Sequence, residues 1–336
     1  MNLIVINLKK YLFTIIAILF VILLLIFSEN NFLATITGMN LFITSVFPSL
    51  FPFLVATEIL YNSNFINLFD NNPKKNSLVS KLFNVPSKSI IAIILGFISG
   101  YPIGAKITTN LKRDKYLSKA EAERLISFTN NSSPIFIIST IGISILGNKT
   151  LGLSLLFIHI FSSILVGLIF RFWKYNDKES LDYSKYISLN DNNKLKTIPS
   201  NIDIFLNSIK NSVNTIFQIG GFVIIFSVIL SILKSTDILN IVSYLLSLTG
   251  IPENVSQSLI FGFFEITNGL NLISTFSSQN LILSLLIISF LLGFGGISIL
   301  FQIYSIIHKE HISIKPYLYG KLLHGIISVI LACIIF

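Results

Sequence analysis

Long apolar stretches separated by short polar segments run through the whole chain. A helix needs ~20 mostly apolar residues to cross a bilayer, and these stretches suffice for about seven such helices. We expect the spans at 11–28, 38–61, 125–147, 150–171, 206–233, 281–307 and 316–336. Two further apolar stretches, 89–105 and 255–275, have flanks that do not fit full spans.

Composition agrees with a polytopic membrane protein. Of the 336 residues, 53% are hydrophobic and 12% are charged, so the apolar surface is too large for a soluble core. The only cysteine, Cys333, lies in the last apolar stretch, which excludes a disulfide framework and a cysteine-based metal site. Residues 11–27 are followed by no small-residue cleavage pattern, so we interpret them as a retained first span rather than a signal peptide.

The positions of the basic residues predict the orientation. Cytoplasmic loops of membrane proteins carry an excess of Lys and Arg. If 89–105 crossed the bilayer, the basic cluster that follows would lie outside, whereas a re-entrant hairpin that enters and leaves on the cytoplasmic face removes this conflict. In this topology only Lys149 and Lys234 of the 24 basic residues face outward, and Lys321 is on the cytoplasmic side. The N-terminus is then inside and the C-terminus outside.

The second half of the chain repeats the first. Residues 84–104 align without a gap with 250–270, and His159 corresponds to His324 at nearly the same separation. The second hairpin, 255–275, has almost no basic flank, as an external hairpin should. The pattern predicts an all-α integral membrane protein with about seven transmembrane helices plus two re-entrant helical hairpins in an inverted-topology repeat.

Polar residues interrupt the apolar segments at three points. The first hairpin tip combines closely spaced glycines with Pro102, which suits tight packing and equally suits backbone groups exposed to a ligand. Glu265, at the second tip, is costly at membrane depth and marks a functional site unless the tip reaches the outer interface. Residues 129–134 interrupt a span and should face protein or a polar cavity. The candidate substrate-binding residues are Ser99, Gly100, Tyr101, Pro102, Lys106, Thr129, Asn130, Asn131, Ser132, Glu265, Thr267 and Asn268.

Other ionisable residues leave alternatives open. Lys106 and Glu58 could close an ion pair over the site or reach interfacial water. His159 and His324 could have paired structural or proton-linked roles, or hydrogen-bond across helices. No phosphate-binding loop, zinc-protease motif or nucleophile elbow is present, so we expect no catalytic residue, no cofactor and no metal. Loop orientation explains the basic residues, so we expect no nucleic-acid partner.

Several blocks resemble a known family. Residues 96–106 and 123–130, with 262–269 and 315–325 in the second half, are similar to the YlbJ family of sporulation integral membrane proteins. The family carries the Gate or nucleoside-recognition domain and is distantly related to concentrative nucleoside transporters. The resemblance implies a cytoplasmic-membrane protein of a spore-forming bacterium that is needed for spore cortex formation. It does not imply a nucleoside substrate.

Together, these observations predict four parts and a function. The parts are an N-terminal transmembrane anchor (1–35), a first Gate-like repeat (36–171), a cytoplasmic polar linker (172–202) and a second, inverted Gate-like repeat (203–336). We expect a transporter-like protein that binds or moves a small polar solute or ion between the hairpins, in the lipid bilayer, alone or with further copies or other sporulation membrane proteins. The alternative is a non-transporting scaffold for envelope assembly. An enzyme acting on a lipid-linked precursor would need an acid–base pair, for which Glu265 with a histidine is the only candidate.

Overall fold

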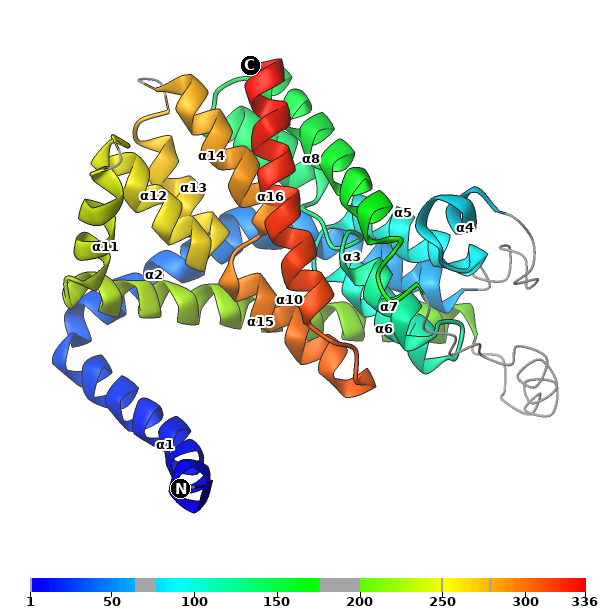
Figure 1. Ribbon diagram of the computed structural model, residues 1–336, viewed down its shortest axis with the longest axis horizontal. Helices are drawn as coiled ribbons and strands as arrows, with labels where there is room; N and C mark the ends of the chain where they lie inside the picture. Colours follow the sequence, from blue (N-terminus) through cyan, green and yellow to red (C-terminus); the bar gives the residue numbers. More distant parts are fainter. Residues whose placement is uncertain (1, 64–76, 176–199, 249, 278–279) are drawn as a thin grey trace.

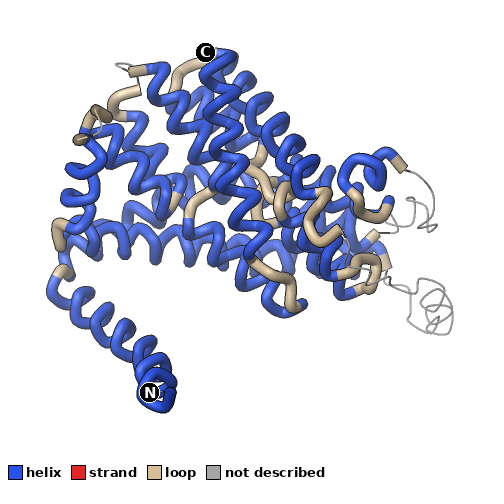
Figure 2. The backbone as a smooth tube through the Cα atoms, in the orientation of Figure 1, coloured by secondary structure: helices blue, strands red, loops and turns tan. Residues whose placement is uncertain are grey.

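The chain is helical throughout its described part. The computed structural model describes residues 2–63, 77–175, 200–248, 250–277 and 280–336, with side chains from residue 11 onward, and these residues contain no strand (Figures 1 and 2). Five helical segments are long and apolar enough to cross a membrane: Ser28–Asn62, Lys149–Phe170, Asn201–Ser235, Leu281–Glu310 and Lys315–Ile335. The prediction of an all-α membrane protein is therefore confirmed. Most of the predicted linker and the basic pair Lys74 and Lys75 lie outside the described residues.

Two helical segments of 35 residues each lie side by side across the molecule. The first comprises α2 (Ser28–Leu41), the π-helical η1 (Phe42–Val46) and α3 (Phe47–Asn62), and the second is α10 (Asn201–Ser235). They run antiparallel, because Asn30 bonds to Ser235 at one end while Phe42 packs on Gly220 further along. At 1.5 Å per residue each measures about 52 Å, well beyond the ~30 Å of a hydrocarbon core. In Figure 1 they run across the picture, whereas the red C-terminal helix runs steeply down it.

The loop expected between the first two spans is helical instead. α1 (Asn2–Ile26) ends at Phe27, and α2 begins at the next residue. The polar residues of this stretch suggested a loop, but they support the helix. Asn31 donates to the carbonyl oxygens of Leu23 and Leu24, both at 3.3 Å. Such local side-chain bonds satisfy the backbone where the two helices meet.

The two halves contain the same kinds of element in the same order after their long helix. The first half continues with α4 (Leu78–Phe83), η3 (Ser87–Ser89), α5 (Ile90–Ser99), α6 (Ile103–Arg113), α7 (Lys119–Ile126), the π-helical η4 (Phe136–Ile145) and α8 (Lys149–Phe170). The second continues with α11 (Ile238–Ser247), α12 (Glu253–Phe264), α13 (Ile266–Ser274), α14 (Leu281–Phe294), α15 (Ile297–Ile307), η5 (His308–Glu310) and α16 (Lys315–Ile335). Each half thus has a short helix, a helical hairpin, a broken segment and a final helix.

In both hairpins the two helices approach each other closely at glycine residues. In the α5–α6 hairpin, a methyl group on Gly96 would lie 3.1 Å from the Cα atom of Gly104. In the α12–α13 hairpin, a methyl group on Gly269 would meet the backbone of Gly262. Small residues allow two helix backbones to approach closely where lipid offers no hydrophobic drive. The first hairpin extends to Arg113, eight residues beyond the predicted end at residue 105.

The predicted span 281–307 is not continuous. It breaks between α14 and α15 at Gly295 and Gly296, whose φ angles are 86° and 89°. Only glycine adopts such angles without strain, so the pair ends one helix and reorients the next. The break occupies the place in the second half that the polar stretch 129–134 occupies in the first.

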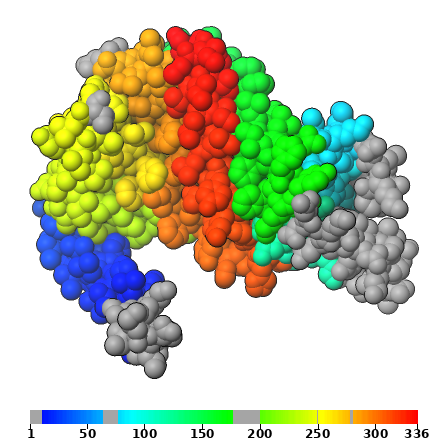
Figure 3. Space-filling model, in the orientation of Figure 1, coloured from blue at the N-terminus to red at the C-terminus, as the bar shows by residue number. Residues whose placement is uncertain are grey.

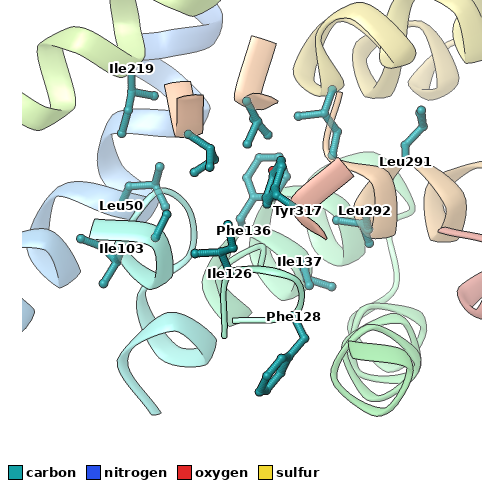
Figure 4. Close-up of a cluster of buried hydrophobic side chains, with 14 of the residues drawn as sticks. Leu50, Ile103, Ile126, Phe128, Phe136, Ile137, Ile219, Leu291, Leu292 and Tyr317 are labelled. Carbon is teal, nitrogen blue, oxygen red and sulfur yellow. The ribbon is translucent and has the colours of Figure 1, made fainter. Parts of the chain in front are cut away.

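The final helices form the bundle seen in Figure 3, where α16 lies beside α14 and α8. Gly293 of α14 faces Gly325 of α16, where a methyl group would lie 2.7 Å from a backbone atom. Ser162 of α8 and Ser328 of α16 meet through their hydroxyls at 2.8 Å. Behind them, large side chains such as Phe136 and Tyr317 fill the core drawn in Figure 4.

Segments predicted to lie on the same side of the membrane gather at the same end of the molecule. Arg124 donates to the carbonyl oxygens of Asn84, Trp173 and Lys174, at 2.8, 2.8 and 3.0 Å. All of these residues are on the expected cytoplasmic side. At the opposite end, Ser277 contacts the carbonyl oxygen of Ile145 at 3.5 Å, and both are expected outside.

Candidate functional site

A cavity lies where the two hairpin tips meet the two broken segments. Its polar wall is formed by several segments. Tyr101 comes from the first tip and Ser132 from the unwound stretch between α7 and η4. Glu265 and Thr267 come from the second tip, and Gln302 comes from α15. Most of the remaining wall is apolar and comes from η1, α3, η4 and α10. About 30 Å³ is open to the centre of a water-sized sphere, which corresponds to roughly two or three water molecules. Four of the residues predicted as substrate-binding therefore line one small space.

Glu265 is held at the N-terminus of α13. Its Oε2 accepts hydrogen bonds from the Thr267 hydroxyl, from the Asn268 backbone N–H at 2.9 Å and from Asn268 Nδ2 at 3.0 Å. The side chain is only 2% exposed. A carboxylate is stabilised there because the first backbone N–H groups of a helix lack partners and carry partial positive charge. All three of these bonds end on Oε2.

Asn268 ties the second tip to α10. Besides bonding to Glu265, its Nδ2 lies 2.9 Å from the Ser227 hydroxyl. Asn268 does not line the cavity. It therefore positions the carboxylate rather than facing the open space.

The first tip is neutral and packs on the unwound stretch. The Tyr101 hydroxyl accepts a hydrogen bond from Ser132 Oγ at 2.9 Å. Gly100 has φ +84°, and a methyl group there would lie 2.9 Å from the Ser133 nitrogen. The Tyr101–Pro102 peptide bond is cis. Ser99 is buried, and its hydroxyl has no hydrogen-bond partner among the described residues.

The unwound stretch between α7 and η4 packs against the first hairpin. Methyl groups on Gly96 or Gly104 would both meet the carbonyl oxygen of Thr129. The side chains that follow turn inward: Asn130 Nδ2 lies 3.5 Å from the Tyr317 hydroxyl, and Asn131 Nδ2 donates to the Phe128 carbonyl at 2.8 Å. The stretch interrupts its segment as the sequence predicted, and these hairpin glycines serve close packing on its backbone.

Lys106 points away from the cavity. Its Nζ lies 2.5 Å from Glu58 Oε1 and 3.1 Å from the Thr215 hydroxyl. Of the two alternatives left open by the sequence, the structure has the ion pair, which joins α6 to α3 and α10. Lys106 therefore lies beside the site, where it links three helices, and is not one of the residues that line the cavity.

Sequence reasoning missed two buried polar residues. Gln302 lines the cavity, and its Oε1 has no hydrogen-bond partner in the described part of the chain. Lys321 was considered only as one of the basic residues on the cytoplasmic side, but it is 1% exposed in α16, with Nζ 3.5 Å from Asn131 Oδ1. The i, i+3 spacing of Lys321 and His324 on one helix face was the available signal.

A second cavity adjoins the first. It shares the walls Phe136 and Thr267, and its polar lining includes Thr140, Ser144 and Asn271. About 110 Å³ is open to the centre of a water-sized sphere. Because Ser144 and Asn271 are exposed, this space leads from the surface to the side chain of Phe136, behind which the Glu265 cavity lies.

Comparison with known proteins identifies a relative. The chain is 31% identical over 316 residues to the sporulation integral membrane protein YlbJ of Bacillus subtilis (strain 168), a match that covers 90% of this chain and 76% of the relative. No protein-family model and no solved structure matches the chain. The identity and the coverage place the chain in the YlbJ family of sporulation integral membrane proteins.

Proposed function

We propose that this protein is a non-catalytic, transporter-like membrane protein of spore formation that binds a small polar solute or ion between its hairpin tips. The observation that carries the proposal is the cavity at Glu265. It combines a carboxylate oxygen, the hydroxyls of Tyr101 and Thr267 and the unpartnered Oε1 of Gln302. Oxygen-rich surroundings of this kind suit a cation or a solute that donates hydrogen bonds.

Size narrows the ligand class. Room for roughly two or three water molecules suits an ion or a solute of similar size. We therefore do not extend the proposal to a nucleoside, although the predicted Gate domain carries that association. The name of the relative supports a role in sporulation, and the resemblance suggests that this role is in spore cortex formation.

The surroundings of the cavity suit passage across a membrane. On one side the exposed second cavity ends at Phe136, and on the side of α3 and α6 the Lys106–Glu58 ion pair holds the helices together. Phe136 begins the π-helical η4, and π-helical turns are frequent at functional sites. We propose that Phe136 separates an outer vestibule from the binding site. In this proposal the protein spans the cytoplasmic membrane several times, with the N-terminus inside and the C-terminus outside.

The experiment is a thermal-unfolding screen of the purified full-length protein in detergent. Sodium, potassium, ammonium and small neutral polar solutes are added one at a time to the wild type, to Glu265→Gln and to the matched control Glu253→Gln. Glu253 is the exposed first residue of α12. A ligand at about 100 times its dissociation constant stabilises the folded state by about 2.7 kcal/mol.

We expect one class of additive to raise the melting temperature of the wild type and of Glu253→Gln but not of Glu265→Gln. Equal shifts in all three proteins would place binding elsewhere. The absence of any shift across the panel would remove the support for a small ligand at this cavity.

A further inference from the structure

A group of buried bases lies beside the unwound stretch. Lys321 Nζ lies 3.4 Å from His324 Nδ1 and 3.5 Å from Asn131 Oδ1. The ring of His324 stacks on that of His159 in α8, with centroids 4.6 Å apart. The two histidines occupy equivalent positions in the two halves, so the group lies where the halves meet.

Hydrogen bonds fix which ring nitrogens carry protons. The Ser132 backbone N–H donates to His159 Nε2 at 3.0 Å, so this nitrogen is unprotonated, because a backbone N–H can only donate. His324 Nε2 lies 3.0 Å from the main-chain oxygen of His159 and is therefore a donor. His324 Nδ1 remains as the atom that faces Lys321. Both rings are neutral in this arrangement, and His324 Nδ1 accepts from the Lys321 ammonium.

No described carboxylate forms an ion pair with Lys321. Among the titratable or charged side chains on the elements packed around it are His159 of α8, His324 and Tyr317 of α16, Tyr101 of the first tip, and Glu123 and Arg124 of α7. The others on these helices are partly or fully exposed: Lys149 of α8, Lys315, Tyr319 and Cys333 of α16, and Lys119 and Glu121 of α7. Glu123 is engaged at the end of the bundle, 3.1 Å from Lys174 Nζ. α14 contributes no titratable side chain. An ionisable residue inside a membrane protein is costly and marks a proton or ion path by default.

We propose that Lys321 and His324 form a proton-binding site that exchanges one proton with water, and that the unwound stretch transmits this exchange to the cavity. On release, one N–H bond of the Lys321 ammonium breaks, the proton passes to water, and Nζ keeps the electron pair. Asn131 then loses its charged donor. The next residue, Ser132, donates to Tyr101 in the cavity wall, so the change reaches the surroundings of the ligand.

The role of this proton in coupling rests on the proposed function, whereas the proton site itself does not. The first test therefore needs no ligand. Purified full-length protein in lightly buffered detergent is titrated between about pH 5.5 and pH 8.5. This interval includes the ordinary pKa of imidazole and lies below the pKa of an exposed lysine. Wild type is compared with Lys321→Met and with the control Lys315→Met, which changes an exposed lysine of the same helix.

We expect Lys321→Met to exchange about one proton per chain fewer than the wild type, because the ammonium group that releases the proton is gone. Lys315→Met should match the wild type. If Lys321→Met does not purify as a monodisperse protein, Lys321→Arg should show the same loss, because arginine keeps its proton at these pH values. Equal titration curves for wild type and for whichever of these variants is monodisperse would overturn the proposal.

A second readout separates an exchangeable proton from a fixed charge. Arginine keeps its charge at all these pH values and cannot release it. At matched abundance in the organism that encodes the chain, Lys321→Arg should therefore form heat-resistant spores as poorly as Lys321→Met. Wild-type sporulation of Lys321→Arg would show that a permanent charge suffices and would refute the coupling role. Failure of the Glu265 ligand screen alone would remove the proposed function and leave the proton site standing.

Discussion

The two hairpin tips occupy equivalent places and are built from different chemistry. Ser99 of the first tip aligns with Glu265 of the second, yet the Ser99 hydroxyl has no partner among the described residues, while Glu265 accepts three hydrogen bonds. The first tip is held from outside, by close contact of Gly100 with the unwound stretch. The second is held from within, by the cap that Glu265 forms on its own helix.

The two breaks differ in the same way. The first is a buried polar stretch, and the second is a pair of glycines with positive φ. As a result, Ser132 brings a side chain to the cavity from the first break, whereas at the second break the cavity is lined by α15 residues such as Gln302. The buried carboxylate of the tips, Glu265, and the buried lysine of the final helices, Lys321, both belong to the second half. The comparison teaches that a nearly symmetric scaffold carries an asymmetric site.

The prediction with the largest expected effect concerns the orientation of the two hairpins in the membrane. The two tips are inverted equivalents only if the hairpins enter from opposite faces of the bilayer. In a Cys333→Ala background, single cysteines at Lys115 and Glu310 should react with a membrane-impermeant thiol reagent only after the cells are opened. A cysteine at Asn148 should react in intact cells. The reason is that basic residues cluster around the first two positions and not around the third.

Strong labelling at position 115 in intact cells would mean that the first hairpin spans the membrane. The two tips would then no longer be inverted equivalents. The same topology puts residues 74 and 185 inside and 278 outside, although these lie outside the described residues.

The next largest effect is expected from substitutions at the two equivalent tip positions, Glu265 and Ser99. Glu265→Gln should reduce the yield of heat-resistant spores to that of a strain lacking the protein, because the amide keeps the shape but not the charge. Ser99→Ala should leave the yield unchanged. Its buried hydroxyl makes no hydrogen bond, so its removal should change stability by no more than about 0.5 kcal/mol.

Spore counts at matched protein abundance measure both variants. Equal yields for Glu265→Gln and the wild type would make the carboxylate a helix cap without a ligand. A severe defect in Ser99→Ala would instead assign a polar role to the first tip.

Much of the fold could be predicted from the pattern of apolar stretches. The helical class, both hairpins and the polar interruption at 129–134 follow from local composition and from the cost of unpaired polar groups in lipid. The break at Gly295 and Gly296 was missed because two glycines do not lower hydrophobicity as a polar run does. The extra helical turns at 29–37 were missed because their polar side chains bond to the preceding turn or pack on α10.

The site could be predicted only in part. Tyr101, Ser132, Glu265 and Thr267 stood out because each interrupts an apolar segment, and all four line the cavity. Gln302 and Lys321 did not stand out, because their places depend on how α15 and α16 pack against the first half. Such contacts between residues far apart in the sequence leave no local signature. The same holds for Phe136, an ordinary apolar residue that lies between the two cavities.

The smallest effect tests how the first tip is held. Gly100→Ala should lower the free energy of unfolding by about 1 to 3 kcal/mol, because alanine is strained at φ +84° and its methyl group would lie 2.9 Å from the Ser133 nitrogen. The matched control is Gly221→Ala in α10, where a methyl group would meet nothing within 4 Å. Alanine there should stabilise the helix by up to about 1 kcal/mol. Thermal unfolding of the two purified variants measures the difference. Equal melting temperatures would mean that the first tip does not depend on close contact with the unwound stretch, and the contrast between a tip held from outside and a tip held from within would fail.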